Sequence, residues 1–138
     1  MANTMLNLIV SLDAGKEIPE RALYDLTTQV LQDIAKSGVI SAQRVRGGKA
    51  KPGEKGPPID VNTLLITLAS AGAVTAVLQV LRDWVLRAEG RKVVVRVKAG
   101  DKSIEFEYTP TAASEEKLMN FAEKLVQMLD KPDLYIGT

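Results

Sequence analysis

The chain has 138 residues, a formal net charge of +1, 46% apolar and 25% charged residues, which suits one globular domain spanning residues 1–138. It has no cysteine and no histidine, which excludes disulfides, thiol nucleophiles and any imidazole base or ligand. The near-zero charge and the 4% of aromatic residues argue against a nucleic-acid partner, because such proteins use basic surfaces and stacking rings. We expect no catalytic residue, no cofactor and no metal.

The first 46 residues have a β-α-β pattern. Residues 4–12 alternate in polarity, which predicts a strand, and apolar Met5 and Ile9 on its second face suggest a central strand covered on both sides. The period then becomes helical over 19–36, and a short polar strand is expected over 39–46. No Lys or Arg precedes the first apolar stretch, so no signal peptide is predicted and we expect a cytoplasmic protein.

A Gly-, Lys- and Pro-rich stretch, GGKAKPGEKGPP at 47–58, raises the question of a phosphate-binding loop. Gly48 and Gly53 have the spacing of a Walker loop, but Glu54 stands where that motif has lysine, and no hydroxyl residue follows. The prolines also lack the N–H donors that cradle phosphate. The stretch is therefore predicted to be a flexible tether, and a nucleotide-dependent enzyme is an alternative that rests on this loop alone.

An uncharged run occupies residues 61–81 and continues through Trp84 to Gly90. With Asp60 as its N-cap, it predicts one helix kinked near Gly72 or two shorter helices. Because about 20 apolar residues can cross a bilayer, a membrane-associated protein with a span at 61–81 is the alternative. Polar residues within the run and basic residues at both ends favour a buried helix, and its surplus apolar surface suggests contact with a partner or a second copy.

The second half also contains a β-hairpin over 91–108. A two-residue turn would place Val97 opposite Ile104 and Arg96 opposite Glu105, so that apolar pairs share one face and an ion pair the other. Ser114 is expected to cap a last helix, which ends before Pro132.

These elements predict an α+β fold, an α/β sandwich with the order β-α-β-α-β-β-α and one mixed four-stranded sheet on which the helices pack. Its parts are the β-α-β half (1–46), the loop (47–59), the long helix, hairpin and last helix (60–130) and a tail (131–138). The interaction surface is expected to comprise Leu64, Leu68, Gly72, Val77, Trp84, Leu134 and Tyr135.

A series of short motifs runs through residues 59–126: an acidic residue, Leu-Leu-x-x-Leu-Ala-Ser-x-Gly, a Trp before basic residues, Gly-Arg before the hairpin, and Ser-Glu-Glu. This segment resembles the effector-associated constant component family of bacterial conflict systems. In this chain the motifs are Asp60, Leu64-Leu65, Leu68-Ala69-Ser70, Gly72, Trp84, Arg87, Gly90-Arg91 and Ser114-Glu115-Glu116.

The resemblance implies a non-enzymatic adaptor in anti-invader (anti-phage) immunity or programmed cell death. Its expected partner is a protein effector or sensor of the same gene neighbourhood, such as a caspase-like or trypsin-like peptidase or an NTP-dependent sensor, and a homo-oligomer is also expected. One departure concerns the stretch after the Trp, which is less Arg-rich here than in related chains and weakens the case for a basic patch.

Overall fold

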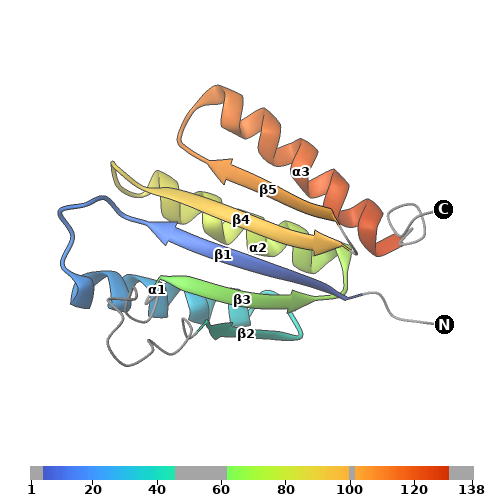
Figure 1. The fold of residues 1–138 in the computed structure, drawn as a ribbon, viewed down its shortest axis with the longest axis horizontal. Helices are drawn as coiled ribbons and strands as arrows, with labels where there is room; N and C mark the ends of the chain where they lie inside the picture. The colour runs from blue at the N-terminus through green and yellow to red at the C-terminus, as the bar shows by residue number, and fades with distance from the viewer. Residues whose placement is uncertain (1–4, 46–61, 100–101, 131–138) are drawn as a thin grey trace, which may run out of the picture.

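The computed structural model describes residues 5–45, 62–99 and 102–130. The loop at 47–58, Asp60 and the tail at 131–138 with Leu134 and Tyr135 lie outside these ranges. Within them the chain forms five strands and three helices. In chain order these are β1 (Leu6–Asp13), α1 (Glu20–Ala35), β2 (Ser41–Arg44), β3 (Thr63–Leu68), α2 (Ala71–Leu86), β4 (Lys92–Ala99), β5 (Lys102–Tyr108) and α3 (Ala112–Asp130), as Figure 1 shows.

The strands form one sheet in the order β2-β3-β1-β4-β5, and every neighbouring pair is antiparallel. The α+β class is therefore confirmed. The predicted sheet was wrong in two respects, because the described residues give five strands rather than four, and the sheet is antiparallel rather than mixed. β1 does lie at the centre, and β3 and β4 flank it.

The additional strand, β3, arises from the uncharged run at 61–81, for which we predicted one or two helices or a membrane span. Residues Thr63–Leu68 pair with β1 and β2, and the helix begins only at Ala71. Ser70 caps it, since its hydroxyl accepts a hydrogen bond from the backbone N–H of Ala73 at 3.1 Å. The break in the run is therefore Ala69-Ser70, and Gly72 lies in the first helical turn. Among the described residues no helix combines the length and hydropathy needed to cross a bilayer.

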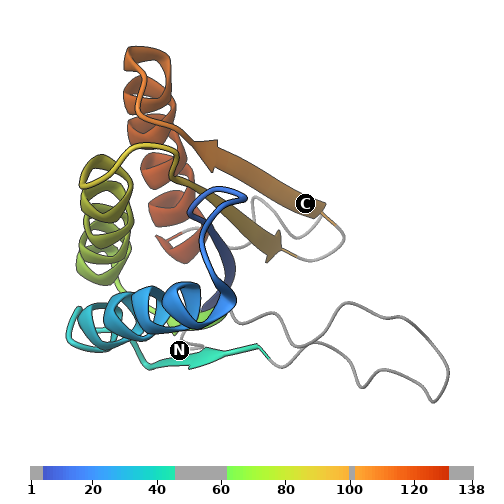
Figure 2. The ribbon, with the colours of Figure 1, turned by 90° about the vertical axis from the view of Figure 1, so that its left-hand side faces the viewer.

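All three helices pack against one face of the sheet, as Figures 1 and 2 show. Alternate residues of the strands point into this layer, so Leu8, Val10 and Val95 are almost completely buried. The opposite face has no helix over it in the described parts of the chain, and there Met5 is exposed and Ile9 half-buried. We expected β1 to be covered on both sides, and within the described residues helices cover it on one side only.

The hairpin register is confirmed. Val97 lies opposite Ile104 on the core face, and Arg96 lies opposite Glu105 on the other. The Arg96 Nε and a Glu105 carboxylate oxygen are 3.0 Å apart, and both side chains are more than half exposed. Such a pair contributes about 0–1 kcal/mol to stability, so the register depends on the buried apolar pairs.

Candidate interaction surface

The helices α2 and α3 run in opposite directions over the sheet (Figure 1). Between them lies an open groove with a volume of about 250 Å³. Its floor includes the buried Leu78 and the half-buried Leu118 and Ala122. Met119 stands beside them with 71% of its surface exposed, the highest value among the described large apolar residues. A flexible, polarizable thioether next to an apolar groove suits contact with another protein.

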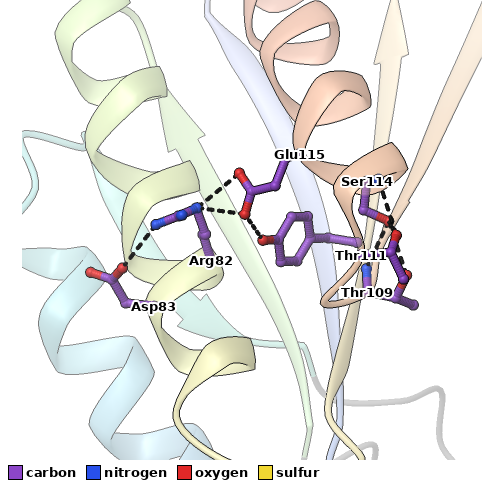
Figure 3. A network of polar contacts seen from close by, with 7 residues as sticks. Arg82, Asp83, Thr109, Thr111, Ser114 and Glu115 are labelled. Atoms are coloured by element: carbon purple, nitrogen blue, oxygen red, sulfur yellow. Dashed lines mark hydrogen bonds and ion pairs between the residues drawn. The ribbon is translucent and has the colours of Figure 1, made fainter.

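A polar network closes one end of this groove (Figure 3). The Arg82 Nε on α2 donates to both carboxylate oxygens of Glu115 on α3, at 2.8 and 3.0 Å. The hydroxyl of Tyr108, at the end of β5, donates to the same carboxylate. Asp83 approaches Arg82 from the other side at 3.7 Å. One carboxylate thus joins α2, β5 and α3, and no side-chain polar atom of Tyr108 or Glu115 is left without a partner.

The network shifts the ionisation of its members in a consistent direction. The hydrogen bond from Tyr108, followed by that from Arg82, holds the pKa of the Glu115 carboxyl below its ordinary value despite some desolvation. Burial, followed by the hydrogen bond to Glu115, raises the pKa of Tyr108 to about 12. The contact with Glu115 raises the pKa of Arg82. Tyr108 therefore remains neutral and Glu115 ionised at physiological pH.

The start of α3 is fixed by a cluster of three hydroxyl residues (Figure 3). The Thr111 hydroxyl oxygen accepts a hydrogen bond from the Ser114 backbone N–H at 3.2 Å, the contact made by an N-cap residue. Ser114 was expected to be the cap, but it lies in the first turn, where its buried hydroxyl contacts Thr109 and Thr111. These bonds anchor the β5–α3 connection and so position Glu115 in the network.

The other side of α2 faces α1 across a much smaller crevice, with a volume of about 60 Å³. Trp84 lines it and is only 4% exposed. Arg91 lies over the indole ring, with its guanidinium carbon 4.6 Å from the ring centre, and its Nη1 donates to the Trp84 carbonyl at 2.9 Å. Burial lowers the pKa of Arg91, as does the nearby Arg87. The indole Nε1 is buried and has no hydrogen-bond partner among the described residues.

Of the predicted interaction residues that the structure describes, most lie in the core and one lies on the surface. Leu64 and Leu68 face the core from β3, and Val77 and Trp84 face it from α2. Their side chains therefore stabilise the fold and are not displayed on the surface. Gly72 is exposed at the start of α2.

The groove between α2 and α3 was not predicted. Its one sequence signal is Met119, an apolar residue next to the buried stripe of the last helix. Within residues 5–45, 62–99 and 102–130, no group of three acidic side chains is arranged to hold a metal ion.

Taken together, the fold is a layer of helices on an antiparallel sheet, with a surface groove between two of the helices. A family model described as Effector Associated Constant Component 1 matches residues 19–126, most of the chain. The chain belongs to this family, and the resemblance seen in residues 59–126 is confirmed and extends back to the start of α1. As the family name states, it is an effector-associated component, of the kind found in conflict systems. No curated protein and no solved structure gives a significant match.

Proposed function

We propose that this chain is a non-enzymatic cytoplasmic adaptor that binds a protein effector or sensor encoded in the same gene neighbourhood. The family assignment supports an association with effectors. The sequence supports a binding role over a catalytic one, because it has neither histidine nor cysteine to activate a nucleophile or to act as one. A peptidase effector or an NTP-dependent sensor is the partner class that the family resemblance implies.

The observation that carries the proposal is the groove between α2 and α3, with the exposed Met119 beside it. Two antiparallel helices with an apolar floor form the kind of groove that accepts the apolar face of a third helix. Arg82 and Glu115 at one end neutralise each other, so a partner helix gains nothing from a charge there. The occupant we propose is therefore an amphipathic helix of the effector, which places apolar side chains against Leu118 and Met119.

The test is a binding measurement between the purified chain and each protein encoded beside it. Met119→Glu places a charge in the groove without disturbing the core, since the side chain is 71% exposed. We expect at least a roughly tenfold loss of affinity for the effector, because a hot-spot residue at an interface typically contributes about 2 kcal/mol or more.

The matched control is Met5→Glu, which introduces the same charge at another exposed methionine, away from the groove. This variant should bind the effector as the wild type does, and thermal unfolding should show that both variants are folded. If Met119→Glu retains full affinity, the groove is not the contact site. If no neighbouring protein binds the wild type at all, the adaptor proposal fails, and light scattering then shows whether a second copy occupies the groove.

A further inference from the structure

The strand β5 forms one edge of the sheet (Figure 1). In an antiparallel pair every second residue directs its N–H and C=O away from the neighbouring strand. Within the described residues no backbone hydrogen bond joins this outer side of β5 to another element. The edge has 7 residues, whereas the opposite edge, β2, has 4. Because unpaired backbone groups at a sheet edge act as a template for a further strand, β5 is the longer of two places where one can add.

The side chains of β5 that point away from the helices are Ser103, Glu105 and Glu107. The two glutamate side chains are 56% and 52% exposed. One oxygen of Glu105 lies 3.0 Å from the Arg96 Nε, and one oxygen of Glu107 lies 3.4 Å from the Lys92 Nζ, both cations being on β4. The second oxygen of each carboxylate makes no contact with the described part of the chain. Each glutamate can therefore accept a further donor.

The charges on this face alternate from strand to strand. Lys92 of β4 lies between Asp13 of β1, at 3.9 Å, and Glu107 of β5. The third cation of β4 on this face, Lys98, lies opposite the uncharged Ser103. Acids and bases thus balance over the face, but the outermost strand carries only acids. A strand added beyond β5 lies about 4.8 Å from the glutamates and about twice as far from the cations of β4, so basic residues opposite the glutamates continue the alternation.

The other side of β5 faces α3. Phe106 of β5 stacks on Phe121 of α3, with their ring centres 4.9 Å apart. Lys117 and Lys124 lie one helical turn before and after Phe121, and both are exposed. On this side an added strand meets the half-buried Ile104 and two lysines, which favours apolar residues and disfavours basic ones. The edge therefore suits a strand that is basic on one side and apolar on the other.

We propose that β5 is a docking site for an extended segment of a partner protein in which lysine or arginine alternates with apolar residues. The segment continues the sheet, with its backbone paired to the outer edge and its basic side chains on Glu105 and Glu107. A second copy fits poorly, because the antiparallel register that pairs all 7 residues of β5 is centred on Glu105 and sets this carboxylate against its own copy. The inference rests on the proposed function only in taking the partner to be a protein.

The probe is a synthetic peptide of alternating lysine and valine with the length of β5, added to the ¹⁵N-labelled full chain. We expect saturable shifts of the β5 amide resonances and slower hydrogen exchange of the amides on its outer side. One control peptide has glutamate in place of lysine, and a second is methylated on its backbone nitrogens, so that it keeps the charges but cannot donate to the edge. Both controls should bind at least about tenfold more weakly.

Charge reversal in the protein tests the assigned contacts. Glu105→Lys combined with Glu107→Lys should reverse the preference, so that the glutamate peptide binds about tenfold better than the lysine peptide. The ion pairs lost are exposed, so this variant should stay folded, which thermal unfolding checks. The matched control, Glu116→Lys combined with Glu123→Lys, makes the same change of net charge at exposed positions of α3 and should keep the wild-type preference.

Four results would overturn the proposal. The lysine peptide shifts no β5 amide, or the methylated peptide binds as well as the unmodified one, which leaves charge attraction without strand addition. The double variant at β5 keeps the wild-type preference. Light scattering shows a dimer of the free chain in which the outer β5 amides are already protected, because a second copy then occupies the edge. None of these measurements involves Met119 or the groove, so the adaptor proposal is tested separately.

Discussion

The two sides of α2 differ in whether their buried polar groups have hydrogen-bond partners. On the side facing α3, Arg82 and the Tyr108 hydroxyl both donate hydrogen bonds to the Glu115 carboxylate, so the buried hydroxyl has an acceptor. On the side facing α1, the Trp84 indole has no acceptor among the described residues. The first cleft is the larger and more open one, yet its polar end is closed by the chain itself.

This difference separates the polar groups that stabilise the fold through hydrogen bonds from one that makes none with the described residues. Tyr108 is the buried member of the paired network, so removing Glu115 would leave its hydroxyl without an acceptor. The α2–α3 groove therefore has apolar surface beside a polar end that is already paired, whereas the Trp84 indole on the other side of α2 makes no hydrogen bond with the described residues.

The largest expected effect concerns the tryptophan that lines the crevice. Trp84→Ala should lower the free energy of unfolding by about 3–5 kcal/mol, because it removes a large buried ring and leaves a cavity between helix and sheet. Urea unfolding followed by circular dichroism measures it. Leu86→Ala, on the same helix but 46% exposed, should change stability by no more than about 0.5 kcal/mol. Similar losses for both variants would show that Trp84 does not pack as described.

A smaller effect is expected at the other side of α2. Glu115→Ala should destabilise the fold by about 1–3 kcal/mol, because the hydroxyl of the buried Tyr108 loses its acceptor. Glu116→Ala removes the neighbouring, exposed carboxylate of the same helical turn and serves as the matched control. The same denaturant measurement applies. If the two variants are equally stable, the Tyr108 hydroxyl does not depend on Glu115 for its hydrogen bond. The α3 side of α2 would then not differ from the side with Trp84.

The elements that could be predicted from the sequence are those with a clear period. The hairpin register followed from the two-residue turn and from Val95 and Val97 alternating with Arg96 and Lys98. β3 was missed because Leu65 is apolar on the face away from the helices, which hides the period of two within an uncharged run. Ser70 was the available signal, since a capping residue marks where the strand ends and the helix begins.

The site was harder to predict than the fold, because its contacts join residues far apart in the chain. In the sequence Glu115 stood out only as part of the Ser-Glu-Glu motif, yet it binds Arg82, 33 positions earlier. Trp84 was expected at a surface, and it lies in the core. A helical period places a residue on the buried face of its own helix, but it does not say which neighbouring element supplies a partner.

The smallest effect concerns the ionisation of Tyr108, which changes stability only at alkaline pH. An unperturbed tyrosine has a pKa near 10, whereas burial and the bond to Glu115 raise the pKa of Tyr108 to about 12. The folded state therefore holds this proton more tightly than the unfolded state does. Its contribution to stability is complete below about pH 10 and is lost as the pH rises toward about 12. Tyr108→Phe has no such proton, so its stability should fall less over this interval.

The measurement is the free energy of unfolding of both proteins between about pH 9 and about pH 12. Lysines also titrate there, so the informative quantity is the difference between wild type and Tyr108→Phe at each pH. Tyr24→Phe, which removes the hydroxyl of a tyrosine that is 46% exposed, serves as the matched control. Parallel curves for wild type and Tyr108→Phe would mean that the hydroxyl is not held by Glu115. The side of α2 that faces α3 would then also contain a buried polar group without a hydrogen-bond partner, as the side with Trp84 does.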